Sequence, residues 1–121
     1  MIIPSIITLA VLSCLSSAHA YAVSDQGELA NLINTQDVVE ITASRLALAR
    51  SADSDVTAYA SRVLGNHTVA NRVLVSLTQA ETLTLSRTLD FEADLAKLET
   101  LEDSDFRAAY AKLMVDVHVW A

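Results

Sequence analysis

The chain has 121 residues, 8 of them basic and 15 acidic, and a formal net charge of −7. This length suffices for one small domain. Because the basic residues are scattered singly among more numerous acidic ones, the composition argues against binding to nucleic acid or to anionic lipid headgroups. Hydrophobic residues make up 52% and aromatic residues only 5%, which predicts an aliphatic core.

The first 20 residues have the form of a secretory signal peptide. They carry no charged side chain, are apolar from Ile6 to Leu15, and end in Ala18-His19-Ala20, a small-x-small pattern that signal peptidases cleave. We therefore expect residues 1–20 to be removed and residues 21–121 to form the mature domain. This domain would lie in the periplasm or otherwise outside the cytoplasm.

Two alternatives would attach the chain to a membrane. Val11-Leu12-Ser13-Cys14 resembles a lipoprotein cleavage box, so Cys14, the single cysteine, is a candidate for lipidation. An uncleaved leader would act as an anchor, although its apolar stretch is shorter than the ~20 residues that span a bilayer. If cleavage follows Ala20, the mature protein has no thiol, which excludes disulfides and thiol catalysis.

The mature chain has the apolar spacing of helices. One Pro and two Gly in the whole chain leave few turn residues for a β-rich fold. We expect helices over about 25–49 and 55–84, and a third helical stretch from 91 to the end that breaks near 102–104. Short connections would make neighbouring helices antiparallel, so the prediction is an all-α, up-down helical bundle of about three long helices.

Several polar residues are suited to begin these helices. Asp25 with Glu28 resembles a capping box at the first helix. Asp53 or Ser54 can cap the second helix, and Ser104 can cap a new segment after the break.

Three polar side chains fall on the apolar stripes, one in each helical stretch: Glu40, His67 and His118. A carboxylate and two imidazoles suit a divalent transition metal such as zinc, iron, manganese or copper. Burying an ionised Glu without a partner costs several kcal/mol, so Glu40 needs a His or a metal beside it. The alternative interpretation is structural, because a His on an apolar face is more often a hydrogen-bonded core residue than a ligand.

A di-iron carboxylate centre is disfavoured by the spacing. Such centres use Glu-x-x-His, which puts both ligands on one helical face. Here Leu64 stands three residues before His67, and Val115 stands three before His118. Because the sequence also shows no Ser-His-Asp set, glycine-rich phosphate loop or Cys-x-x-Cys pair, we expect no enzymatic activity.

The order and spacing of these segments resemble the bacterial, exported domain-of-unknown-function family 4142, which is classed as ferritin-like and often labelled a predicted outer membrane protein. The resemblance covers about residues 24–121. It departs from the family at Arg107 and Val117, where the family usually or often has Asp. The matching pieces are Val39-Glu40-Ile41, Leu46 to Ala49, Val56 to Ala60, Val63-Leu64, Asn66-His67, Phe106, Ala109, Tyr110, Met114-Val115 and His118.

The resemblance implies a four-helix bundle, because the family continues into a further helix that bears another His. This chain stops three residues after His118. We therefore expect an incomplete bundle with an exposed apolar groove of several hundred Å², through which the chain can form a homo-oligomer. The family has no settled activity, so the resemblance implies a non-enzymatic, structural or stress-related module of the cell envelope. A metal-binding protein is the alternative.

Overall fold

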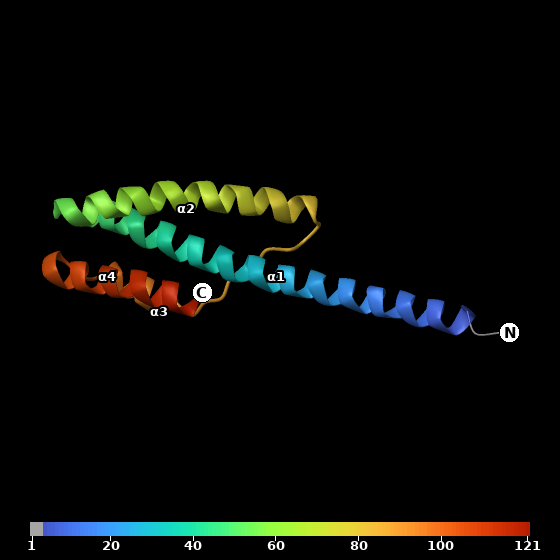
Figure 1. Cartoon of the computed structure of the whole chain (residues 1–121). Coiled ribbons are helices and arrows are strands. Elements are labelled where there is room, and N and C mark those ends of the chain that lie inside the picture. The colour runs from blue at the N-terminus through green and yellow to red at the C-terminus, as the bar shows by residue number, and fades with distance from the viewer. Residues whose placement is uncertain (1–3) are drawn as a thin grey trace.

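The computed structural model describes residues 4–121, with side-chain environments from residue 26 onward. Its regular structure consists of four helices, α1 (Pro4–Arg50), α2 (Ser54–Ala80), α3 (Glu92–Leu98) and α4 (Asp103–Trp120) (Figure 1). The all-α prediction is confirmed. α1 is the central element, since it contacts each of the other three helices.

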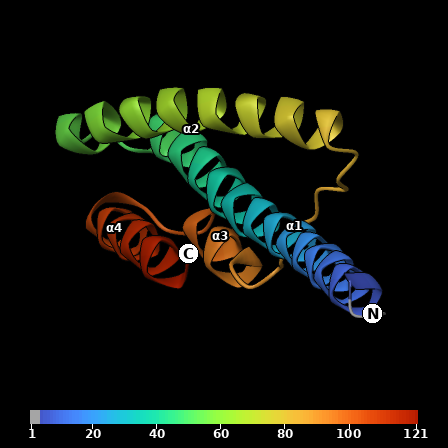
Figure 2. The same cartoon turned by 45° about the vertical axis from the view of Figure 1, so that its right-hand side comes forward.

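The helices lie around α1 on different sides. α2 folds back along α1, and α4 lies away from α2 in both views (Figures 1 and 2). Arg50 donates a hydrogen bond to the Leu101 carbonyl, and Ser44 shares one with Tyr110 farther along α4. α4 is therefore antiparallel to α1, as α2 is, and both begin at the same end of the bundle.

The expected break in the third helical stretch is confirmed, and it turns the chain around. α3 and α4 form a hairpin in which Phe91, just before α3, packs edge-on against Trp120 at the end of α4, with ring centroids 5.5 Å apart. The expectation that Ser104 caps α4 is wrong. The cap position lies two residues earlier, at Glu102, which makes no side-chain hydrogen bond there, and α4 begins at Asp103.

The first helix does not begin at Asp25, as the capping-box pattern predicted, but at Pro4. No proline interrupts residues 5–50, and Gly27 alone does not break a helix whose neighbours propagate it. Cys14, the leader at residues 1–20 and Asp25 itself lie outside the residues whose side chains are described. Cleavage and lipidation therefore stay predictions.

α2 ends at Ala80 rather than near Thr84, because the backbone turns left-handed at Thr82 (φ 56°). The Leu83 N–H then bonds to the Thr78 carbonyl and the Thr82 N–H to the Gln79 carbonyl. This is a Schellman motif, which normally has Gly at the left-handed position.

Asp53 caps α2, which confirms one of the two candidates for that position. Its Oδ1 accepts hydrogen bonds from the backbone N–H groups of Asp55 and Val56. Its Oδ2 lies 2.6 Å from the Arg107 guanidinium of α4. Asp53 therefore links the beginnings of α2 and α4.

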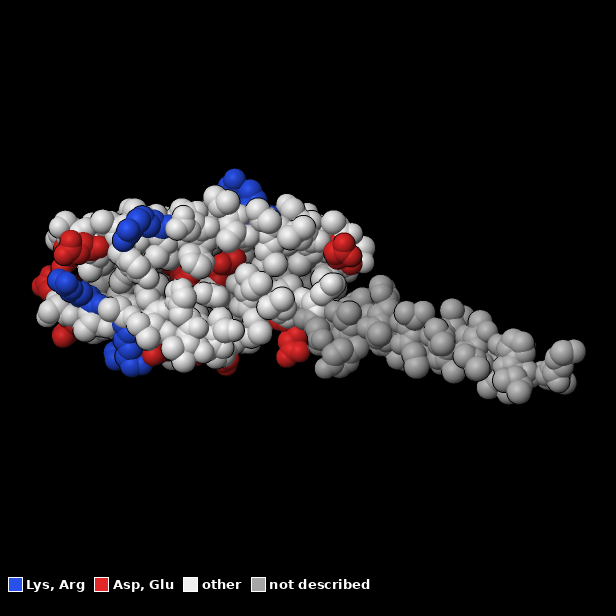
Figure 3. Space-filling model, viewed as in Figure 1, with Lys and Arg blue, Asp and Glu red and all other residues white. Residues whose placement is uncertain are grey.

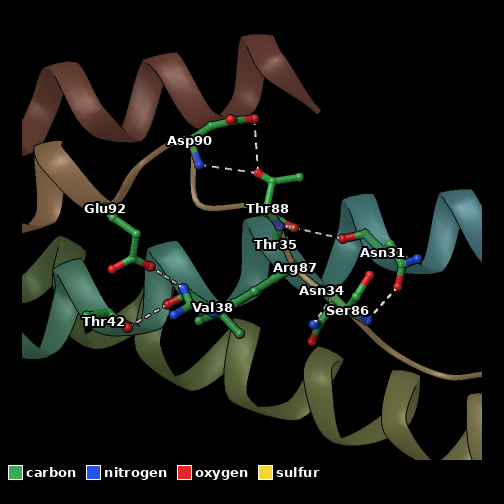
Figure 4. A network of polar contacts seen from close by, with 10 residues as sticks. All are labelled: Asn31, Asn34, Thr35, Val38, Thr42, Ser86, Arg87, Thr88, Asp90 and Glu92. Atoms are coloured by element: carbon green, nitrogen blue, oxygen red, sulfur yellow. Dashed lines mark hydrogen bonds and ion pairs between the residues drawn. The ribbon is translucent and has the colours of Figure 1, made fainter.

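The connection between α2 and α3, residues 81–91, runs along α1 (Figure 4). Asn31 accepts a hydrogen bond from the Ser86 N–H (2.7 Å), Asn34 donates to the Ser86 carbonyl (2.9 Å), and Thr35 accepts from the Thr88 N–H (3.1 Å). Backbone groups outside helices need such partners. Polar side chains on one face of α1 thus set the path of this connection.

The core lies where α2, α3 and α4 cover α1, and it includes Val39, Val56, Ala60, Phe106 and Val117. The apolar stripes are buried only in part. Leu29 and Ile33 of α1, Leu77 of α2 and Val119 of α4 belong to apolar stripes but are exposed. Among the described residues, none of the helices has the length and hydrophobicity of a bilayer-spanning segment.

Candidate metal centre

Glu40, His67 and His118 converge from α1, α2 and α4. Each offers one ligand atom, and these three atoms lie within 4.8 Å of one another. Two ligands bound at about 2.1 Å on opposite sides of one ion are about 4.2 Å apart, so movements below about 1 Å would bring all three within bonding distance of a metal. The sequence placed these residues on three facing stripes, and the structure brings all three together.

His67 lies between two carboxylates of α1. Its Nδ1 is 2.8 Å from Asp37 Oδ1, and its Nε2 contacts Glu40 Oε2. A carboxylate accepts hydrogen bonds, so Nδ1 carries a hydrogen that it donates to Asp37. In the neutral ring, Nε2 then has its lone pair towards Glu40, so a hydrogen bond between them needs a proton on the Glu40 carboxyl group or a second proton on the ring. Either such a proton or a metal ion must separate Nε2 from the Glu40 oxygen.

His118 approaches Glu40 from α4, whereas His67 approaches it from α2. Its Nδ1 lies 2.9 Å from Glu40 Oε1 and 2.6 Å from the Met114 carbonyl, one turn earlier in α4. The His118 and His67 rings are perpendicular, with centroids 6.5 Å apart. The two imidazoles therefore approach the Glu40 carboxylate from different directions, as two ligands of one ion do.

Glu40 is fully buried, with 0% of its surface exposed. Neither of its oxygens has a well-aligned hydrogen-bond donor, despite the nearby imidazole nitrogens, and the Gln36 side chain, one helical turn earlier, is a further donor close to it. Burial raises the pKa of the Glu40 carboxyl above its ordinary value, and the charges of His67 and His118 oppose this rise. An ionised Glu40 is thus costly in this place, and a cation between the three side chains would remove that cost.

The cluster is closed on one side and open on the other. Glu40 is buried and His67 partly so, whereas the His118 side chain is 52% exposed. Three protein ligands with one open side is the arrangement of zinc sites that keep a coordination position for water or another ligand. His118 also lines a groove of about 600 Å³ between α2 and α4, with Tyr59, Met114 and Val115.

Sequence reasoning missed Asp37, which is buried and holds His67 in place. Its signal was available, because Asp37 and Glu40 are three residues apart and share a helical face. A carboxylate that accepts the second N–H of a ligating His fixes the tautomer and the ring orientation. Asp37 is in the position for that task.

Tyr110 of α4 and Ser44 of α1 form a pair next to the site, and Ser44 lies one helical turn after Glu40. The two hydroxyls share a buried hydrogen bond of 2.9 Å, and Tyr110 stacks on Phe106. Burial raises the pKa of the Tyr110 phenol above its usual value, so this group stays neutral. The pair fixes the register of α4 on α1, and thereby the place of His118 relative to Glu40.

Comparison with known proteins identifies one family. The model of a family described as Domain of unknown function (DUF4142) matches residues 13–121 and so includes all three candidate ligands. No curated protein and no solved structure matches the chain significantly. Because the family model covers most of the sequence, the chain belongs to the DUF4142 family.

Proposed function

We propose that this chain is an exported, non-catalytic helical-bundle protein of the cell envelope that binds one divalent transition-metal ion through Glu40, His67 and His118. The observation that carries the proposal is the fully buried Glu40 carboxylate, which faces two imidazoles without a hydrogen bond to either. Export rests on the form of residues 1–20.

The charges of the cluster favour a divalent cation. Asp37 and Glu40 supply two negative charges around His67, and the neutral imidazoles supply lone pairs without charge. Without metal, the contact between His67 Nε2 and Glu40 needs a proton, either on the ring or on the carboxyl group. A metal ion replaces that proton, so binding would release protons and strengthen as the pH rises.

Zinc titration of the protein, purified without a histidine tag, tests the proposal. We expect one ion per chain by calorimetry, with heats that depend on the ionisation enthalpy of the buffer because protons are released. His67→Ala should weaken binding at least ~100-fold, since it removes a ligand and not merely an outer contact.

Asn66→Ala is the matched control, because Asn66 is the exposed neighbour of His67 on α2. It should bind zinc as the unaltered chain does. Absence of stoichiometric binding to the unaltered chain, or equal binding by His67→Ala, would contradict the proposal. In that case the cluster would be a structural network, which is the second interpretation of these residues.

Asp37→Asn should weaken zinc binding about 10–100-fold without removing a ligand. The amide oxygen still accepts the hydrogen bond from His67 Nδ1, but it no longer carries the charge that makes Nε2 more basic. Competition with a chromogenic chelator measures this change. Asp94→Asn, at an exposed position of α3, is the control and should leave the affinity unchanged; an equal effect of both variants would mean that only the net charge matters.

A further inference from the structure

The metal cluster lies beside an apolar groove, and of its three residues only His118 lines that groove. Leu29 and Ile33 share one face of α1 and form the floor of the groove's part between α1 and α2. Tyr59 and Leu77 are 18 residues apart, five helical turns, and thus lie on one side of α2. Two hollows flank the cluster on this side, one of about 600 Å³ between α2 and α4 and one of about 340 Å³ between α1 and α2.

The rim and floor of this groove carry large apolar side chains that the described residues leave partly exposed. Their exposed fractions range from 36% to 82%. In Figure 3, uncharged residues cover much of α2 and of the region between α2 and α4. The side chains are Leu29 and Ile33 of α1, Tyr59, Val69, Val73 and Leu77 of α2, and Val115 and Val119 of α4.

The area of this surface fits a second protein copy. Together these eight partly exposed residues present several hundred Å² of apolar surface, which approaches the ~800 Å² that each partner buries in a standard stable interface. A small ligand in the hollow beside His118 would leave Val69, Val73 and Leu77 exposed. An occupant that covers all of them must follow α2 over most of its length.

We propose that this groove is the interface of a symmetric dimer, in which α2 of each copy packs antiparallel on α2 of the other. Val69 and Val73 lie on the outer ridge of α2, and the groove runs beside that ridge. Under a two-fold axis near the middle of α2, each ridge enters the partner's groove, and Tyr59 of one copy meets Leu77 of the other. The dimer covers the open side of the metal cluster, but it does not depend on bound metal.

The net charge of −7 on each chain opposes this association. Such repulsion between surface charges is screened at physiological salt, whereas burial of apolar surface is not. The dimer should therefore be tighter at high ionic strength than at low ionic strength. An interface held mainly by ion pairs would show the reverse.

Sedimentation velocity of the naturally processed protein, with a chelator present, tests the proposal. We expect a dimer at micromolar concentration. Val73→Glu and Leu77→Glu should raise the dissociation constant at least ~100-fold, because each would bury a charge against the partner. Both positions are exposed in the single chain, so the variants should keep their helical circular dichroism and their zinc affinity.

Leu89→Glu is the matched control. Leu89 is 69% exposed but lies on the connection between α2 and α3, outside the groove, so this variant should remain a dimer. A monomer at all concentrations, a dimer that the chelator dissociates, or equal behaviour of the three variants would overturn the proposal. None of these results would bear on zinc binding by the single chain.

Cross-linking tests the antiparallel arrangement directly. Val69→Cys lies near the proposed axis, so two copies should form an intersubunit disulfide under mild oxidation, as Cα atoms within about 7 Å permit. Leu89→Cys should not cross-link, and the protein without an added cysteine reports any bond through Cys14. Equal yields from Val69→Cys and Leu89→Cys would overturn the arrangement.

Discussion

Glu40→Gln is expected to stabilise the metal-free protein near pH 8 and to abolish its stabilisation by zinc. The folded chain raises the pKa of Glu40 above the ordinary value of 4.5. An ionised Glu40 therefore costs stability: the cost is absent below the unfolded pKa and grows as the pH rises through the folded one. Glutamine has the same shape without the charge, so the advantage of the variant should disappear near pH 4.

Zinc should make the unaltered protein more stable than the Glu40→Gln variant. At a free zinc concentration of 100 times the dissociation constant, the unaltered protein gains about 2.7 kcal/mol, whereas Glu40→Gln lacks an anionic ligand and gains much less. Urea unfolding with and without zinc at pH 8 measures both effects. Glu99→Gln, at an exposed carboxylate beyond α3, is the control. If Glu40→Gln strongly destabilises the metal-free chain, Glu40 holds the bundle together through its ion pairs with His67 and His118.

Phe106→Ala should cost about 3–5 kcal/mol, the usual range for removing a buried aromatic ring from a core. Phe106 is 1% exposed and stacks on Tyr110, so its removal leaves a cavity between α4 and α1. Total stabilities of small proteins are about 5–15 kcal/mol, which makes this a large fraction of the whole.

Urea denaturation followed by far-ultraviolet circular dichroism measures the loss. Ser104→Ala is the control on the same helix: Ser104 is exposed outside the groove, and alanine is the better helix former, so its effect should stay within about 0.5 kcal/mol. A loss below about 1 kcal/mol for Phe106→Ala would mean that α4 does not pack firmly on α1.

The helices could be predicted from the spacing of apolar residues, and the site from polar residues that interrupt this spacing. Glu40, His67 and His118 stood out because a charged or ring-nitrogen side chain is costly on an apolar stripe, and this cost requires that they meet. Asp37 escaped notice because it lies beside the stripe and acts through His67. Whether a metal binds depends on small differences in position that spacing alone does not give.

Helix ends and the extent of burial were less predictable. The left-handed residue that ends α2 is Thr82, a β-branched residue that rarely adopts positive φ, so the sequence carried no glycine signal there. Leu29, Ile33 and Leu77 repeat with helical spacing, yet they are exposed, because periodicity shows which face is apolar and not what covers it. The ferritin-like class, export and non-catalytic role stay predictions.

The candidate ligands lie on different helices, so the site can form only in the order in which those helices fold. Asp37, Glu40 and His67 meet within the α1–α2 hairpin, whose contacts are closer in sequence than those of α4, so this half of the cluster can form early. His118 is contributed by the last helix. By thermodynamic reciprocity, an ion bound at the cluster would hold α4 in place, and any event that detaches α4 would loosen the ion by the same factor.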